Sequence, residues 1–139
     1  MLVLDTDVQS LTENAGPDAA SLQTRLGADG RPQTITIMSV QERLRGRIAV
    51  CQRATDPDAY VRAARLLHRT FVVLQKLTIL DFDDRAANQF RSLKAQRIRI
   101  GTMDLRIASI VLAHGGLLIS RNLIDFRKVP NLRVEDWTR

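Results

Sequence analysis

The sequence predicts an α/β fold, a three-layer sandwich in which a central, mostly parallel sheet of about five strands has helices on both faces. Short apolar segments with β-branched residues alternate along the chain with longer segments whose apolar residues recur every three or four positions. The chain has 139 residues, which is enough for one hydrophobic core and too few for two. We therefore expect a single domain over residues 1–139.

The expected strands are short and largely buried. The first covers residues 2–5, where three apolar residues end at Asp5. The second covers residues 34–38, in which Thr and Ile alternate, a pattern typical of β structure. Further strands are expected at residues 77–80, 117–120 and 132–135.

The expected helices occupy the segments between the strands. They cover residues 18–27, 39–51, 57–74, 83–93 and 102–113. Pro57 suits the first turn of its helix, and Thr102 is a candidate N-cap. The Ser39-Val-Gln-Glu42 sequence matches a capping box, and Gly115 with its following glycine is a normal helix stop.

The charge of the chain favours a polyanionic partner such as nucleic acid. The formal net charge is +6, and 18 of the 21 basic residues are Arg. Forked Arg donors suit phosphate and carboxylate groups better than Lys does. A GC-rich genome would produce the same Arg bias, and charge alone does not separate the two explanations.

Nothing in the sequence indicates a membrane or an oxidising compartment. There is no apolar run long enough to span a bilayer, and the chain starts directly with a strand-like segment instead of a signal peptide. The single Cys51 cannot form an internal disulfide and lies on the buried face of an expected helix, so we give it no redox or nucleophilic role. We expect a cytoplasmic protein.

Acidic and amide side chains stand where apolar, strand-like segments are expected to end. They are Asp5, Glu42, Asp104 and Asn122. The carboxyl ends of parallel strands meet at one edge of a sheet, so these side chains should converge there. Crowded carboxylates repel one another unless a cation neutralises them, and hard oxygen ligands suit Mg²⁺ or Mn²⁺. The pattern predicts a divalent-metal site.

Each of the three acids also has a purely structural explanation. Asp5 is a good N-cap for a helix that would begin after it. Glu42 completes the capping box, or pairs with one of the Arg residues that follow it, Arg43 among them. Asp104 lies in a first helical turn, where an acid opposes the macrodipole favourably. Their joint placement is what favours a functional site.

The segment after the expected fourth strand adds three polar groups in a row. Ser120 supplies a hydroxyl, Asn122 an amide and Asp125 a carboxylate. The oxygen of Asn122 is able to bind a metal or its water without adding charge. For Asp125 we favour a structural role in orienting the loop or capping the turn, with Phe126 as an anchor in the core.

In order and spacing, these motifs resemble those of the PIN-domain ribonucleases, specifically the VapC-type toxins of bacterial toxin–antitoxin pairs. The matching pieces are Leu4-Asp5-Thr6, Glu42-Arg-Leu-Arg-Gly46, Gly101-Thr-Met-Asp104-Leu, Ser120-Arg-Asn122-x-x-Asp125-Phe126 and Pro130-x-Leu-Arg-Val-Glu-Asp-Trp137. Each motif is short, but the ordered set spans essentially the whole chain and is much more specific than any single piece.

The resemblance implies a metal-dependent endoribonuclease. Asp5, Glu42 and Asp104 match the three principal acids of the family, Asn122 falls where many members have a fourth acid, and Ser120 takes the place of a common Thr. By this resemblance, Asp5 and Asp104 would hold Mg²⁺ or Mn²⁺, while Glu42 binds through water or directs the attacking water. Ser120 and Asn122 would position water or a phosphate oxygen.

The resemblance also implies partners, and two rival functions stay open. The expected partners are RNA (tRNA, rRNA or mRNA), a cognate antitoxin protein and a second copy of the chain in a homodimer. One rival is an inactive PIN-like domain that binds RNA or protein, which Asn122 would permit. The other is a phosphatase with an Asp nucleophile, suggested by Asp5 and Asp7 standing two residues apart.

Overall fold

The computed structural model describes residues 1–139 and contains one five-stranded sheet in which every strand pair is parallel. The strand order is β3-β2-β1-β4-β5. The strands are β1 (Leu2–Leu4), β2 (Gln33–Thr36), β3 (Thr78–Leu80), β4 (Leu117–Ile119) and β5 (Val134–Glu135). The chain reverses its direction of winding at β1, so the carboxyl ends of β1 and β4 form the switch point where α/β folds bind ligands. The predicted fold class is confirmed.

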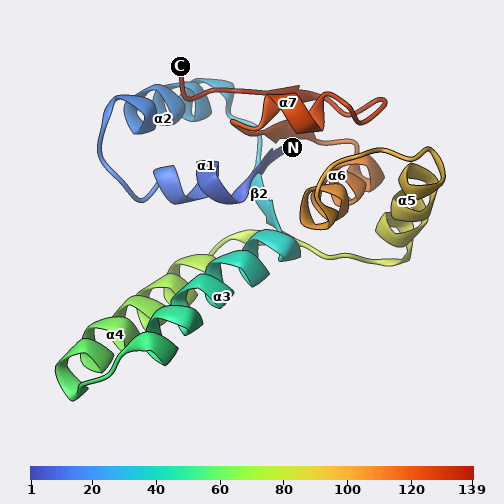
Figure 1. Ribbon diagram of the computed structural model, residues 1–139. Coiled ribbons are helices and arrows are strands. Elements are labelled where there is room, and N and C mark those ends of the chain that lie inside the picture. Colours follow the sequence, from blue (N-terminus) through green and yellow to red (C-terminus); the bar gives the residue numbers. More distant parts are fainter.

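The chain contains seven helices, of which α3 and α4 project away from the sheet (Figure 1). They are α1 (Thr6–Leu11), α2 (Pro17–Asp29), α3 (Ile37–Arg53), α4 (Pro57–Leu74), α5 (Asp84–Ala95), α6 (Thr102–His114) and α7 (Leu123–Phe126). None of these helices has both the length and the apolar character that crossing a membrane requires.

Alternate residues of the short strands feed two separate hydrophobic cores, as the two-residue period of a strand demands. Val3 and Leu118 point to one face, where they pack with buried residues of α5 and α6. Leu2, Leu4 and Ile119 point to the other face and pack with buried residues of α1 and α2. The sheet is therefore buried on both sides, which explains why its strands contain continuous apolar runs.

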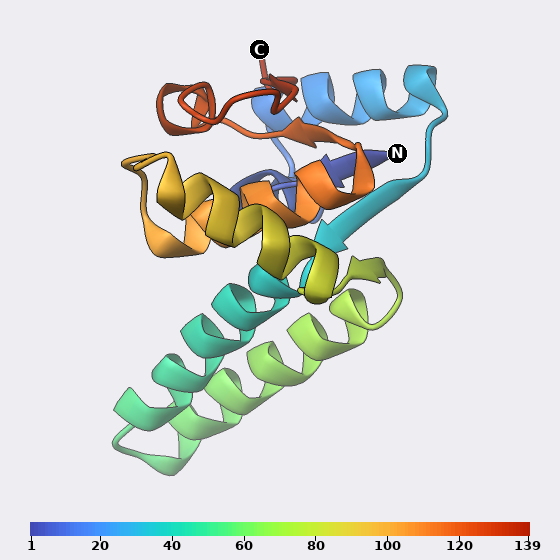
Figure 2. The ribbon, with the colours of Figure 1, turned by 90° about the vertical axis from the view of Figure 1, so that its right-hand side faces the viewer.

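Helices α3 and α4 form an antiparallel hairpin that extends away from the body of the molecule (Figures 1 and 2). Helix α4 begins as expected from the sequence, because Asp56 caps it by accepting a hydrogen bond from the amide of Ala59 at 2.9 Å, and Pro57 occupies the first position. Only the first turns of α3 lie against the sheet, so the hairpin carries Glu42 at its base and exposes most of its length.

Two predicted helix N-caps are wrong, by three positions for α3 and by one position for α6. Helix α3 begins at Ile37, because the hydroxyl of Thr36 caps it by accepting from the amide of Ser39 at 3.2 Å. The second strand accordingly ends at Thr36 instead of residue 38. Helix α6 is preceded by Gly101, without a side-chain cap, so Thr102 is its first residue and not its N-cap.

Candidate active site

Asp5 lies directly after β1 and serves as the N-cap of α1, so the structural explanation for this residue holds alongside any functional one. One carboxylate oxygen accepts from the amide of Thr6 at 2.8 Å. The other accepts from the hydroxyl of Ser120 at 2.7 Å, which links the carboxyl ends of β1 and β4. The position and the rotamer of this carboxylate are thus fixed from two sides.

The charge of Asp5 is costly in this position. Burial raises the pKa of Asp5 to about 6, against the lowering effect of the hydrogen bonds from Ser120 and Thr6, and the negative charges of Asp104 and Asp7 raise it further. A carboxyl group that is buried beside other acids gains from a nearby cation, because the cation restores the stability of its ionised form.

Glu42 stands in the second turn of α3 and accepts a hydrogen bond from the hydroxyl of Thr6. The hydroxyl of Thr6 also lies 3.1 Å from that of Ser39. Because Thr36 is the N-cap, Glu42 is too far along α3 to close a capping box on Ser39, and that structural explanation is wrong. The contact with Thr6 instead ties this carboxylate to the residue that follows Asp5.

Asp104 is half-buried in the first turn of α6, so the predicted first-turn placement is right. Burial raises its pKa, followed by the negative charges of Glu42 and Asp125, while a hydrogen bond from Asn122 opposes the rise. Asp104 therefore lies near enough to Glu42 for the charge of Glu42 to affect it, and Asp5 is affected in turn by the charge of Asp104. Of the three, only Asp5 directly follows a strand; the segment before Asp104 forms no strand, contrary to the expectation.

Asn122 caps α7 and contacts two of the neighbouring acids. Its oxygen accepts from the amide of Asp125 at 3.4 Å, and its side-chain nitrogen donates to Asp104 at 3.2 Å and to Asp125 at 3.2 Å. The backbone N–H of Asn122 donates to the hydroxyl of Ser120 at 3.0 Å. Asp125 pairs with Lys128 at 2.8 Å, consistent with a role in orienting the loop. Phe126 is fully buried.

The donor chemistry of these residues fits a hard divalent cation, although the side chains are not arranged as a coordination sphere. No group of three or more His, Cys, Asp or Glu side chains has positions that would hold a metal ion. Asp5, Glu42 and Asp104 are instead held by hydroxyl and amide donors. They remain an all-oxygen set whose mutual repulsion a cation would relieve.

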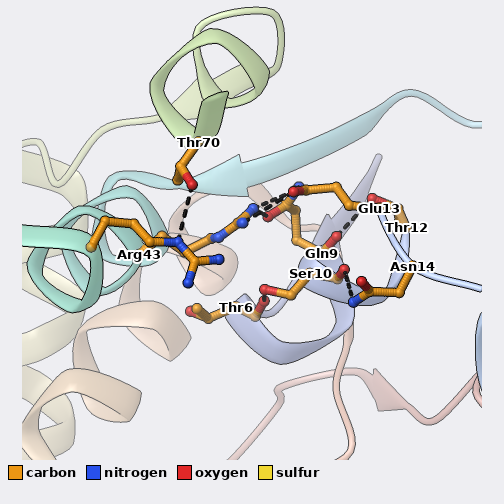
Figure 3. Close-up of polar contacts among 9 residues, drawn as sticks. Thr6, Gln9, Ser10, Thr12, Glu13, Asn14, Arg43 and Thr70 are labelled. Carbon is orange, nitrogen blue, oxygen red and sulfur yellow. Dashed lines mark hydrogen bonds and ion pairs between the residues drawn. The ribbon is translucent and has the colours of Figure 1, made fainter. Parts of the chain in front are cut away.

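Sequence reasoning missed a polar network behind the site. Arg43 is buried and donates to Glu13 and to Gln9 of α1 (Figure 3), so it does not pair with Glu42. Next to it, the guanidinium of Arg47 donates to Thr70 of α4 at 3.1 Å. The only sequence signal for this network was the four-residue spacing of Gln9 and Glu13, which places both on one face of a helix.

Several curated proteins with sequences similar to this chain share the name VapC. The chain is 38% identical over 68 residues to ribonuclease VapC2 of Haemophilus influenzae and 32% identical over 68 residues to the tRNA(fMet)-specific endonuclease VapC of Salmonella typhimurium. Each match covers 46% of this chain, and the chain spans about half the length of these relatives, 52% in both cases. A match to the endonuclease VapC of Shigella flexneri covers 98% of this chain and 97% of the relative at 24% identity. No family profile matches the chain.

Solved structures extend the likeness over the whole chain. The fold superposes on that in a DNA-bound VapBC structure from Salmonella typhimurium with a TM-score of 0.75 at 23% identity, covering 98% of this chain and 97% of that one. VapBC-1 from Haemophilus influenzae gives 0.74 at 20% identity, covering 99% and 98%. At these identities the superpositions establish the fold. The sequence matches add a similarity, over about half of the chain, to relatives named ribonuclease or endonuclease VapC.

Proposed function

We propose that this protein is a metal-dependent endoribonuclease and the toxin of a toxin–antitoxin pair. The observation that supports the proposal is a series of hydrogen bonds around the carboxyl ends of β1 and β4, in which Thr6 donates to Glu42, Ser120 to Asp5 and Asn122 to Asp104. Relatives that share part of this sequence are named ribonuclease or endonuclease, which supports RNA as the substrate.

Asp5 and Asp104 are the residues that would hold Mg²⁺ or Mn²⁺, with Glu42 as a third oxygen donor through water. When bound, the cation would lower the pKa of water and neutralise charge on the phosphate. Thr6 holds the carboxylate of Glu42 in place, ready to orient a water molecule or accept its proton. Ser120 and Asn122 fix the rotamers of Asp5 and Asp104, and no covalent nucleophile is required.

The partners we propose are RNA, an antitoxin protein and a second copy of the chain, in the cytoplasm. The antitoxin is supported by solved structures of similar fold, which include DNA-bound VapBC proteins and a toxin–antitoxin complex from Klebsiella pneumoniae. The α3–α4 hairpin offers a suitable surface, because an apolar groove of about 390 Å³ runs along one side of it between Leu44, Ile48, Leu67 and Phe71. Ile48 and Phe71 are 45% and 53% exposed, so a partner helix would bury them.

The test is RNA cleavage by the purified protein without antitoxin. We expect cleavage with Mg²⁺ or Mn²⁺, none with EDTA, and a loss of at least about 100-fold in the Asp104→Asn variant, because that change removes a metal ligand. Asp84→Asn, an exposed acid at the start of α5, is the matched control and should leave the rate unchanged.

Sequencing of RNA ends after brief expression, with Asp104→Asn as background, would then locate the cleavage sites. RNA binding without metal-dependent cleavage would support the inactive binding domain instead. Formation of a hydroxylamine-sensitive acyl phosphate on Asp5 would support the phosphatase.

A further inference from the structure

The α3–α4 hairpin has a second side, opposite the apolar groove, on which four arginines are exposed. We name these residues, Arg53, Arg62, Arg65 and Arg69, the basic track. Arg62, Arg65 and Arg69 follow one another at spacings of three and four residues, so they form a single stripe along α4. None of the four arginines takes part in an ion pair. None donates a side-chain hydrogen bond either, so their donors are free for a ligand.

Two hollows connect the members of the basic track. Arg53 of α3 and Arg62 of α4 line one groove of about 360 Å³ between the two helices. Arg62, Arg65 and Arg69 line a second hollow of about 620 Å³ on the outer face of α4. Arg62 lines both hollows, so the four arginines are neighbours along one surface of the hairpin rather than scattered charges.

The basic track leads to the candidate active site. Glu42, Gly46, Ala49 and Arg53 recur at spacings of four, three and four residues, so they share one face of α3. Arg53 therefore lies on the same side of the hairpin as Glu42, eleven residues or about 16 Å farther along the helix. Between Glu42 and Arg53, the exposed Gly46 has no side chain, and a Cβ placed on it would meet no atom within 4 Å. The surface is therefore open at this position.

Helix α4 then carries the track back toward the body of the molecule (Figure 2). Arg69 is adjacent to Thr70, which accepts a hydrogen bond from Arg47 of α3. Arg47 is only five residues, or about 7.5 Å, beyond Glu42. One end of the track thus lies near the level of the acids and the other near the tip of the hairpin.

We propose that the basic track binds the sugar–phosphate backbone of the RNA and guides the strand toward Glu42. The proposal rests on the ribonuclease function proposed above, for which it names a substrate-docking surface. Free guanidinium groups that repeat about every turn along a helix complement a chain of phosphates, and such contacts hold RNA irrespective of its sequence. An acidic protein segment would need carboxylates at the same spacing, whereas any RNA carries its phosphates at regular intervals.

The test measures binding of a fluorescently labelled, unstructured RNA to the Asp104→Asn protein by anisotropy at several salt concentrations. The test variant is Arg62→Gln/Arg65→Gln/Arg69→Gln in that background. The control is Arg91→Gln/Lys94→Gln/Arg97→Gln, which removes the same charge from exposed positions on and just after α5. We expect the test variant alone to bind about tenfold more weakly, with the slope of log affinity against log salt reduced by about 2, or about 0.7 for each lost phosphate contact.

Charge-conserving Arg→Lys changes at the same three positions should restore most of the salt slope, because the lost positive charge and not substitution at these positions as such weakens binding. Equal losses of RNA affinity in the test and control variants, or no loss in either, would contradict the proposal that the basic track binds RNA. The absence of measurable RNA binding at low salt would contradict it as well. A test variant that loses affinity for polyglutamate but not for RNA would also overturn it, in favour of an acidic protein segment. RNA binding through the track without cleavage by the unmutated protein would refute the ribonuclease and leave the track standing.

Discussion

At the scale of single residues, Asp5 shows how one side chain serves the fold and the candidate site together. It caps α1 through one oxygen and accepts from Ser120 through the other. Burial raises the pKa of Asp5 more than these two hydrogen bonds together lower it, so the pKa rises to about 6. The folded protein therefore keeps an ionised carboxylate at neutral pH at the expense of stability, as acids arranged for catalysis commonly do.

Replacing Asp5 by Asn should stabilise the metal-free protein at neutral pH. The pKa of Asp5 is raised from 3.8 to about 6, so the fold holds this proton more tightly than the unfolded chain does. Its contribution to stability is complete below pH 3.8 and is lost as the pH rises through about 6. A rise of that size corresponds to about 3 kcal/mol, and Asn retains the capping ability.

Urea unfolding in EDTA at pH 7.5 and pH 4.5 measures the difference between wild type and Asp5→Asn. We expect Asp5→Asn to be more stable at pH 7.5 and the gap to shrink at pH 4.5, where the wild-type carboxyl group is protonated. A gap of the same size at both values of pH would show that charge at Asp5 is not its cause.

At the scale of elements, α1 and the residues just after it are tied to α3 by a partly buried ion pair. Arg43 has 5% of its side chain exposed and pairs with Glu13, whose side chain is 29% exposed. Burial tends to raise the pKa of Glu13, but the hydrogen bonds from Arg43 and Gln9 outweigh that effect and lower it. Since Thr6 of α1 contacts Glu42 of α3, the same packing aligns the candidate site.

The Glu13→Gln variant should lose about 1–3 kcal/mol of unfolding free energy, because Arg43 is left buried with an incomplete set of partners. Adding Arg43→Met to Glu13→Gln should recover part of this loss, since the apolar side chain needs no partner although the amide oxygen of buried Gln9 loses its donor. Urea unfolding of wild type, the two single variants and the double variant gives the four unfolding free energies of a double-mutant cycle. Additive losses in the double variant would mean that the two residues do not interact.

The elements could be predicted from sequence wherever local signals and tertiary contacts agree. Asp56 and Pro57 mark the start of α4, and Gly115 adopts the left-handed conformation that ends α6, as expected of glycine at a helix stop. The capping box at Ser39 failed because Thr36 caps the helix one turn earlier. Its partner Glu42 then bonds to Thr6, 36 residues away in sequence.

In the candidate site, too, contacts between distant segments could not be predicted from local sequence. The residue types and their order in the chain indicated Asp5, Glu42 and Asp104; in the structure the charge of Asp104 raises the pKa of Asp5, and that of Glu42 raises the pKa of Asp104. The partners that hold them were not predictable, because the bonds from Ser120 and Asn122 join segments 115 and 18 residues apart. Their role in catalysis stays a prediction.

At the scale of the whole molecule, the three acids come together only when the chain folds. Asp5 follows β1, Glu42 stands on α3, and Asp104 stands on α6, so the unfolded chain has no comparable group of ligands. A cation that binds this group binds the native state alone, and binding must then raise the free energy of unfolding of the entire domain.

Mn²⁺ at ten times its dissociation constant should stabilise the protein by about 1.4 kcal/mol, the value that linkage requires for one site. The gain should disappear in Asp104→Asn, which removes a ligand, and persist in Asp84→Asn, which removes an equal charge from α5. Thermal unfolding with Mn²⁺ or with EDTA, at matched ionic strength, gives the comparison. Because the readout is stability, it tests the metal site even if the RNA target is unknown. An equal gain in both variants would mean that Mn²⁺ acts elsewhere on the surface, and the acids around β1 and β4 would then lose their assignment as metal ligands.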